Sequence, residues 1–353
     1  MKKIISALIK ESKYELFHYP LYTKKQDLKY LIKRVLKPKD TPKRDSFFWP
    51  HAMLAQALEE AGELETLIKY FDAWIEKGLP IINVDNIMNG YSLLYIYEKT
   101  GDAKYRQVAD KLYQWTCEYG KQMGNPMPYR KHHPNHVYVD GLGMVVPFLC
   151  RYGSKFHKNE AIDLAVAQVK DFLSYGMDNA TGLPYHGYNT KTKEKQGIIG
   201  WGRAVGWLML AMADSIEYIS DEDGKEELIR EFTKLSNATL KYLREDGYFS
   251  WQLSAMEGPR DTSATAMIGY ALKKSVSINA KLLKEIENGA EEINVEEAIT
   301  KIDTAIVKSY REGKIYDCSG ECDGFSQYPQ RYGAYPWSLG PGLRFLLTKT
   351  HND

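Results

Sequence analysis

Two aspartates mark places where a long polar segment gives way to an apolar, helix-like one. Asp85 and Asp140 each follow an apolar residue and precede a polar or small one at such a boundary. Two carboxylates held close together do not both ionise easily, so one of them can stay protonated and donate a proton. We therefore interpret Asp85 and Asp140 as candidate catalytic residues of a site that performs general acid–base chemistry.

A cation and several flat rings occur at equivalent boundaries. Arg203 begins a helix-like segment between Trp201 and Trp207, and a spacing of four residues places Arg203 and Trp207 on one helix face. An arginine can bind a carboxylate through two parallel hydrogen bonds, and aromatic faces line many ligand pockets. The candidate substrate-binding residues are His186, Trp201, Arg203, Trp207, His132, His133 and Trp337.

Each of these residues also has a purely structural interpretation. Aspartate is a favoured helix N-cap, and Asp261, which precedes Thr262 and Ser263, fits that role best. An arginine can lie at the surface and pack its stem on a tryptophan, and the basic run from Arg130 to His136 can be a solvated loop. The sequence leaves these alternatives open.

The sequence predicts neither a metal site nor an organic cofactor. His132, His133 and His136 lack the spacing of a helical metal site, and no carboxylate supports them at ligand spacing. Cys318 and Cys322 lack a second pair of ligands, and the chain has no glycine-rich phosphate loop or serine-nucleophile motif. We therefore expect a site that works without metal or cofactor.

The elements that must position these residues are almost all helices. Apolar residues recur at three- and four-residue spacing along most of the chain, whereas strand-like runs are rare and short. The predicted helices are Asp27–Leu36, His51–Gly62, Glu65–Lys77, Ile87–Thr100, Ala103–Tyr119, Leu142–Tyr152, Glu160–Tyr175, Ala204–Ile219, Glu226–Leu243, Ser263–Lys273, Val295–Tyr310 and Trp337–Leu347.

The connectors between the helices alternate between short and long, which puts every long connector at one end of a bundle of antiparallel helix pairs. Long connectors in compact proteins are usually functional. This pattern predicts an all-α fold, an (α/α)6 barrel that forms a single domain over residues 1–353. A two-domain all-α protein is the alternative, but no linker rich in Pro, Ser or Gly divides the chain. The long connectors are Lys37–Phe48, Gly78–Asp85, Gly120–Val139, Gly176–Trp201, Arg244–Asp261 and Glu312–Pro336.

The overall composition excludes several classes of protein. The 353 residues contain 47 Lys plus Arg and 46 Asp plus Glu, so no general field attracts nucleic acid or an anionic membrane. Four cysteines suit a reducing compartment, and the short apolar run near Met1 does not make a signal peptide. We expect a cytoplasmic protein, a monomer or weak homodimer, that binds no nucleic acid and no membrane. The 26 Tyr and 7 Trp are the unusual feature.

Several motifs, taken in order, resemble the unsaturated rhamnogalacturonyl hydrolases of glycoside hydrolase family 105, which is related to the family 88 unsaturated glucuronyl hydrolases. The resemblance runs from about Trp49 to Leu347, and Gly141 and Gly143 depart from it because relatives carry larger residues there. The motifs are DNIMNGYSLLYIYEKTGD from Asp85, YVDGLGMVVPFLCRYG from Tyr138, WGRAVGW from Trp201, DTSATAM from Asp261 and PWSLGPG from Pro336.

The resemblance implies an enzyme that releases the unsaturated uronic acid left by a lyase, with unsaturated galacturonyl-rhamnose as the first candidate substrate. It implies hydration of the C4=C5 double bond, in contrast to the usual displacement by two carboxylates. Asp140 matches the general acid/base and Asp85 its partner carboxylate. Arg203 matches a contact to the uronate. Further matches to substrate contacts are His186, Trp201 and Trp207, with His132 and His133 in the subsite beyond the uronate.

Other functions remain as alternatives. Within the same chemistry, the protein could be an unsaturated glucuronyl hydrolase that acts on glycosaminoglycan or arabinogalactan fragments. From another class, a sugar epimerase or isomerase can use the same toroid, but that chemistry usually requires paired histidines and the helix starts supply aspartates. A glycan-binding toroid without catalytic activity is a third possibility.

Overall fold

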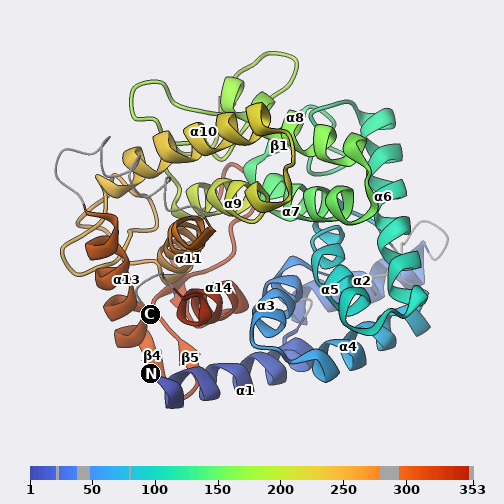
Figure 1. Cartoon of the computed structure of the whole chain (residues 1–353), viewed down its shortest axis with the longest axis horizontal. Helices are drawn as coiled ribbons and strands as arrows, with labels where there is room; N and C mark the ends of the chain where they lie inside the picture. Colours follow the sequence, from blue (N-terminus) through green and yellow to red (C-terminus); the bar gives the residue numbers. More distant parts are fainter. Residues whose placement is uncertain (21–23, 38–47, 79–80, 279–293, 350–353) are drawn as a thin grey trace.

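The chain folds into two concentric rings of helices, as a computed structural model shows (Figure 1). The structure describes residues 1–20, 24–37, 48–78, 81–278 and 294–349. The predicted (α/α)6 barrel is confirmed. Most of the Lys37–Phe48 connector and residues 79 and 80 of the Gly78–Asp85 connector lie outside the described residues.

The inner ring consists of helices that each follow a long connector. Neighbouring members pack against one another around the ring, from α3 through α5, α7, α9 and α11 to α14, which returns to α3. Their side chains are buried on nearly every face because each helix has neighbours on both sides. The inner helices are α3 (Trp49–Glu60), α5 (Asn89–Thr100), α7 (Val139–Phe156), α9 (Gly202–Ala213), α11 (Thr262–Ile278) and α14 (Pro336–Leu347).

The outer ring consists of amphipathic helices that cover the inner one. Each bears an apolar stripe toward an inner helix and a polar face toward solvent. Connectors of a few residues join the inner helices α3, α5 and α7 to the outer helices that follow them, and Gly101 ends α5 in the left-handed conformation with φ of 69°. The outer helices along the chain are α4 (Leu64–Glu76), α6 (Ala103–Met123), α8 (Asn159–Tyr175), α10 (Glu222–Leu240) and α13 (Val295–Ser309).

The sixth outer position is filled by α1 (Lys2–His18), a helix that the sequence analysis did not predict. It packs against α3 and α14 and buries Leu8 and Leu16, so the two ends of the chain close the ring together. The predicted helix near Asp27 exists as α2 (Lys24–Leu36), which exposes the apolar side chains Leu28, Leu31, Ile32, Val35 and Leu36.

The long connectors carry the few strands. β1 (His136–Tyr138), β2 (Gly187–Asn189) and β3 (Lys195–Gln196) form an antiparallel sheet that ties the connector before α7 to the connector before α9. In the last long connector, β4 (Tyr310–Arg311) pairs with β5 (Lys314–Ile315), and β6 (Cys318–Ser319) pairs with β7 (Tyr332–Gly333). These pairings hold long polar segments against one end of the ring.

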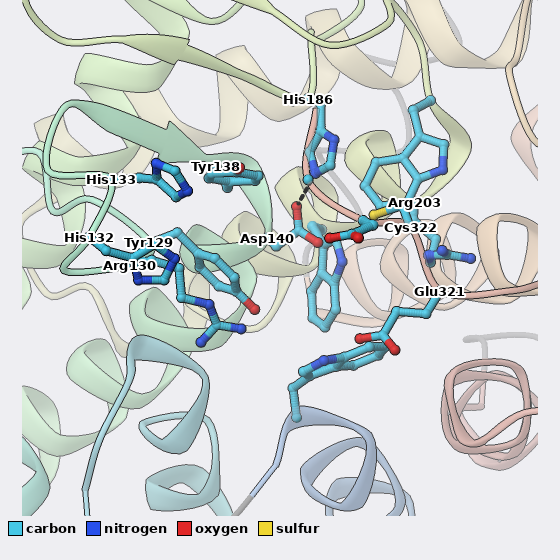
Figure 2. A pocket seen from close by; sticks show the side chains of 15 residues that line it. Tyr129, Arg130, His132, His133, Tyr138, Asp140, His186, Arg203, Glu321 and Cys322 are labelled. Atoms are coloured by element: carbon cyan, nitrogen blue, oxygen red, sulfur yellow. Dashed lines mark hydrogen bonds and ion pairs between the residues drawn. The ribbon is translucent and has the colours of Figure 1, made fainter. Parts of the chain in front are cut away.

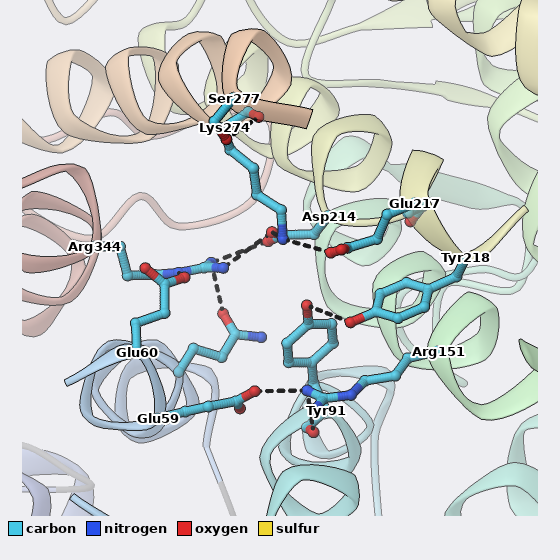
Figure 3. A network of polar contacts seen from close by, with 12 residues as sticks. Glu59, Glu60, Tyr91, Arg151, Asp214, Glu217, Tyr218, Lys274, Ser277 and Arg344 are labelled. Carbon is cyan, nitrogen blue, oxygen red and sulfur yellow. Dashed lines mark hydrogen bonds and ion pairs between the residues drawn. The ribbon is translucent and has the colours of Figure 1, made fainter. Parts of the chain in front are cut away.

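At the other end of the ring, charged side chains link the last turns of the inner helices (Figure 3). Arg344 of α14 donates to both carboxylate oxygens of Asp214, at 2.9 and 3.0 Å, and to Glu60 of α3 at 2.7 Å. Lys274 of α11 also contacts Asp214, at 3.0 Å. Burial raises the pKa of Asp214, but Arg344 and Lys274 outweigh it and hold that pKa well below its usual range.

Membrane-spanning helices were sought among the described residues. None of the helices there combines the length and the apolar character that crossing a bilayer requires.

Candidate active site

A cavity of about 250 Å³ opens at the end of the barrel where the inner helices begin (Figure 2). The first turns of α3, α7 and α9 form its base, and the connectors before α7 and α14 form its walls. The lining residues are Trp49, Tyr129, Arg130, His132, His133, Tyr138, Asp140, His186, Trp201, Arg203, Trp207, Glu321, Cys322, Asp323 and Gly324.

Asp140 is the carboxylate at the base of this cavity. It lies in the first turn of α7, whose N-cap is Tyr138, so its side chain does not serve as the cap. The side chain is 15% exposed, and Oδ2 lies 3.1 Å from Nε2 of His186. Figure 2 shows the carboxylate in the middle of the lining residues. The cap interpretation applies instead to Asp261, which accepts from the backbone N–H of Ser263 at 2.9 Å.

His186 connects Asp140 to Tyr328 of the connector before α14. Its side chain is 1% exposed, and Nδ1 lies 2.8 Å from the hydroxyl oxygen of Tyr328. The imidazole packs against the ring of Trp201 at 4.4 Å and meets the edge of Tyr138 at 5.1 Å. The ring therefore has a fixed orientation, in which one nitrogen faces the carboxylate and the other faces a phenol.

Asp85 lies behind the cavity wall, and its carboxylate is not among the lining groups. It belongs to the short 3-10 helix η1 (Val84–Asn86), is 1% exposed, and accepts from Arg130 Nη1 at 3.1 Å. Burial raises the pKa of Asp85, and Arg130 lowers it in part. Burial and Arg130, and not a neighbouring carboxylate, are the largest causes of this shift. Arg130 lines the cavity, so Asp85 acts on the site through that guanidinium.

Arg203 lines the cavity and also anchors the last long connector. Nη1 donates to Ser319 Oγ at 2.6 Å and to the Ser319 carbonyl at 3.0 Å, while Nη2 donates to the Gly320 carbonyl at 2.7 Å. The guanidinium packs on Trp201, 4.7 Å from the ring centroid. By holding the backbone at Gly320, Arg203 sets Glu321 and Cys322 in the cavity wall.

The tryptophans have different places in the site. Trp201 and Trp207 line the cavity, as does Trp49, which the sequence analysis did not select. Trp337 does not line it, in contrast to its predicted place there. Its indole N–H donates to the Ser319 carbonyl at 2.9 Å, and its ring lies 5.0 Å from Trp49. Trp337 therefore supports the wall from behind.

His132 and His133 stand at the exposed rim of the cavity, where the structure brings them together with Arg130. Their ring centroids are 4.5 Å apart, and His133 stacks on His136 at 5.4 Å. Burial, and then the nearby His133 and Arg130, lowers the pKa of His132. In the described part of the chain, no group of three or more His, Cys, Asp or Glu side chains is placed to hold a metal ion.

The cavity also contains residues that the sequence analysis did not select. Glu321 and Asp323 add carboxylates from the connector before α14, and desolvation raises the pKa of Glu321 against the lowering effect of Arg203 and Arg130. Tyr129 and Tyr138 come from the connector before α7. The sequence feature that could have identified these four residues is their position, because each lies in a long connector at the end of the barrel where the cavity opens.

This arrangement can transfer a proton to an anionic, ring-shaped ligand. One carboxylate has an oxygen fixed by a histidine, two guanidinium groups line the same space, and indole rings form flat walls. A cavity of this size encloses about one sugar ring and leaves the next ring near the rim.

Known proteins match this chain over most of its length. The sequence family described as Glycosyl Hydrolase Family 88 matches residues 36–329. Unsaturated rhamnogalacturonyl hydrolase YesR of Bacillus subtilis (strain 168) is 23% identical over 309 residues, which are 85% of this chain and 86% of that protein.

Two solved structures share the fold. A possible member of family GH105 from Salmonella enterica subsp. enterica serovar Paratyphi A superposes with a TM-score of 0.79 at 18% identity, covering 98% of this chain and 93% of that one. An unsaturated glucuronyl hydrolase responsible for the degradation of glycosaminoglycan, from Bacillus sp. GL1, gives a TM-score of 0.67 at 16% identity, covering 86% of each chain.

Proposed function

The chain belongs to glycosyl hydrolase family 88, and on that premise we propose that this glycoside hydrolase removes an unsaturated uronic acid from the non-reducing end of lyase-generated oligosaccharides. The substrate that we propose first is unsaturated galacturonyl-rhamnose, because YesR, which aligns over most of both chains, is an unsaturated rhamnogalacturonyl hydrolase. Membership of a hydrolase family sets aside the sugar epimerase and the glycan-binding toroid without catalytic activity.

The observation that carries the proposal is the position of Asp140. Its carboxylate lies at the base of a cavity lined by Arg130 and Arg203, so an anionic sugar can bind with its ring beside this carboxylate. Oδ2 is occupied by His186, which leaves Oδ1 as the oxygen to exchange a proton with the substrate. Trp201 and Trp207 provide flat faces for the sugar ring.

The proposed reaction adds one water molecule across the C4=C5 bond. Asp140 gives its proton to C4, a water oxygen bonds to C5, and the carboxylate takes the proton that this water loses. A C–H bond and a C–O bond form while the π bond breaks. The hemiketal at C5 then opens at the ring oxygen, and the hemiacetal left at C1 releases the aglycone. Substrate and water supply every atom, so this chemistry needs no cofactor.

The other residues have supporting roles in this proposal. Arg203 or Arg130 pairs with the uronate carboxylate, and Asp85 keeps Arg130 in place. His132 and His133 at the rim contact the sugar beyond the uronate. The basic character of that rim favours one alternative substrate class, unsaturated glucuronyl fragments whose aglycone carries an anionic group.

Replacing the carboxylate by an amide of the same shape tests the assignment. We expect Asp140→Asn to lower kcat by about a thousandfold while substrate still binds, since an amide neither gives nor takes the proton. The measurement is the loss of ultraviolet absorbance of the unsaturated uronate, with a Lys10→Ala protein, changed at an exposed position, as a folded control. An Asp140→Asn protein with full turnover would refute the role of Asp140.

A panel of lyase products tests the substrate. We expect the highest kcat/KM on unsaturated galacturonyl-rhamnose, with unsaturated chondroitin and heparin disaccharides as competitors. A preference for the glucuronyl compounds would replace the first substrate by the alternative, and no turnover of any of them would refute the proposed reaction.

A further inference from the structure

Three side chains from distant parts of the chain form a line that ends at the candidate acid. Tyr328 belongs to the connector before α14, His186 to the connector before α9, and Asp140 to α7. The Tyr328 hydroxyl lies 2.8 Å from His186 Nδ1, and His186 Nε2 lies 3.1 Å from Asp140 Oδ2. Tyr328 is not among the residues that line the cavity; its hydroxyl reaches the site through His186, and its ring packs on Trp201 at 5.6 Å.

The direction of these hydrogen bonds follows from the carboxylate at the end of the line. An ionised carboxylate can only accept, so the Nε2 atom of His186 that lies against ionised Asp140 Oδ2 carries a hydrogen. A neutral imidazole with its hydrogen on Nε2 has a lone pair on Nδ1, and the Tyr328 hydroxyl donates to it.

We propose that Tyr328 is a positioning residue that fixes His186 as the neutral tautomer with its hydrogen on Nε2, and thereby makes Oδ1 of Asp140 the oxygen that carries the transferable proton. With Oδ2 engaged as an acceptor, a protonated Asp140 holds its hydrogen on Oδ1. This inference rests on the proposed function only where it concerns turnover. The tautomer itself is a property of the free protein.

The packing around His186 leaves little freedom for another arrangement. The imidazole contacts the rings of Trp201, Tyr138 and Phe325 at 4.4, 5.1 and 5.2 Å. An added Cβ at Gly197, where φ is +80°, would come within 2.6 Å of both the His186 Cβ and the Tyr328 hydroxyl. Only glycine lets the backbone pass this close to both side chains.

Among the described residues, four other titratable groups lie near this line. Tyr138 meets the imidazole edge. Tyr129, Cys322 and Arg203 interact electrostatically with Asp140. Burial and the Asp140 charge raise the pKa of the Cys322 thiol to about 12, so this thiol stays neutral near pH 7. Among these groups, the phenol of Tyr328 alone contacts His186 Nδ1.

The first test reads the tautomer without using activity. The chain has eight histidines, so the imidazole nitrogen resonances of His186 can be assigned by comparison with a His186→Asn protein. We expect nitrogen NMR of the wild-type protein to show the neutral ring with hydrogen on Nε2. In Tyr328→Phe we expect a mixture of tautomers or a protonated ring. A wild-type ring with hydrogen on Nδ1, or identical spectra in both proteins, would overturn the proposal.

The second test separates positioning from substrate contact. Phe keeps the ring of Tyr328 that packs on Trp201, and Tyr332→Phe removes a hydroxyl from the same connector that bonds Gln330 instead. We expect Tyr328→Phe to lower kcat about tenfold, to leave KM within about twofold, and to shift the pH profile of kcat, while Tyr332→Phe behaves as wild type. A raised KM with an unchanged pH profile would mean that Tyr328 contacts the substrate and would overturn the proposal.

A double variant tests whether Tyr328 acts through His186. If it does, His186→Asn combined with Tyr328→Phe loses no more kcat than His186→Asn alone, because the second change has no imidazole to affect. Independent, additive losses would contradict the proposal. An inactive wild-type protein with the Nε2 tautomer would refute the proposed function and leave this inference standing.

Discussion

At the scale of residues, the shape of the cavity depends on Gly143, which follows the candidate acid Asp140 by three residues in α7. An added Cβ at Gly143 in α7 would lie 2.4 Å from Cε3 of Trp207 and 3.0 Å from the Trp207 carbonyl oxygen. Gly141 has ordinary space, with Val84 at 3.5 Å and Tyr129 at 3.6 Å. The two glycines that depart from the family motif therefore differ in their roles. Gly143 makes room for Trp207, whereas the position of Gly141 has space for a larger side chain.

We expect Gly143→Ala to destabilise the protein by about 1–3 kcal/mol and to lower activity, because the methyl group displaces Trp207 from the cavity wall. Gly141→Ala is the matched control, because in the same helix turn its methyl group would make only ordinary van der Waals contacts. Its stability should equal or slightly exceed that of wild type, since alanine favours a helix more than glycine does. Thermal unfolding and kcat/KM measure both. Equal stability of the two variants would show that Trp207 can move away from the methyl group without a loss in the free energy of unfolding.

The pair formed by Asp85 and Arg130 predicts a pH-dependent stability. Burial raises the pKa of Asp85, so its ionised form is disfavoured in the fold and its protonated form is favoured as the pH falls. Removing Arg130 raises that pKa further. We expect Arg130→Met to destabilise the protein by about 2 kcal/mol near pH 8, because an uncompensated charge is buried, and by less as the pH falls toward 5.

Chemical unfolding of wild type and Arg130→Met between pH 5 and 8 measures this effect. In an Asp85→Asn/Arg130→Met protein, the carboxylate is absent, so the remaining loss should not depend on pH. An Arg130→Met penalty that is constant over the whole range would mean that Asp85 does not need the guanidinium.

At the scale of elements, the long connectors bring distant residues to one cavity. The strand pairs β1–β2 and β6–β7 each fix a connector that would otherwise have no regular partner. The connector before α14 supplies Glu321 and Cys322 to the cavity and Tyr328 to His186 behind it, although it follows α7 in sequence by more than a hundred and fifty residues. The alternation of short and long connectors predicted that the long connectors share one end of the barrel. Which of their side chains face the cavity depends on the strand pairs that fix the connectors.

The helix α1 makes a prediction of its own at this scale. Leu8 is fully buried where α1 packs against α3 and α14, whereas Lys10 is exposed on the same helix. We expect Leu8→Ala to lower the free energy of unfolding by about 3 kcal/mol, because the change removes buried apolar surface and leaves a cavity. Lys10→Ala, which keeps helix propensity, should have little effect. Chemical denaturation of both proteins checks this, and a Leu8→Ala protein as stable as wild type would exclude α1 from the core.

At the scale of the whole molecule, closure of the ring connects the two ends of the chain. α14 packs between α11 and α3, and Arg344 joins α14 to Asp214 at the end of α9 and to Glu60 of α3. We propose that residues 1–353 form a single domain, because no inner helix lacks a neighbour on either side among the described elements. The polar network lies at the end opposite the candidate active site.

A single domain predicts one cooperative unfolding transition. We expect Arg344→Met to lower the unfolding temperature, since it leaves Asp214 buried with Lys274 as its remaining cationic partner, at a cost of about 3–5 kcal/mol. Circular dichroism and tryptophan fluorescence should report the same midpoint before and after the substitution. Two separate transitions in either protein would show that the chain divides into independent units.

The sequence by itself determined most of the helices, their alternation and the residues at the starts of the inner ones. Helical periodicity and connector length are local properties, so the chain shows them without any tertiary contact. The resemblance to known hydrolases rested on the same local motifs. Asp140, His186, Trp201, Arg203 and Trp207 were found in this way, and the structure brings all five to one cavity.

Only the tertiary structure decided which of the selected residues face the cavity and what holds them. Asp85 lies behind Arg130, and Trp337 lies behind Trp49. Tyr328 reaches His186 across more than a hundred residues of sequence. Burial, hydrogen bonding and pKa depend on contacts between segments far apart along the chain, and no local pattern encodes such contacts. For the same reason the sequence did not predict that α1 completes the ring.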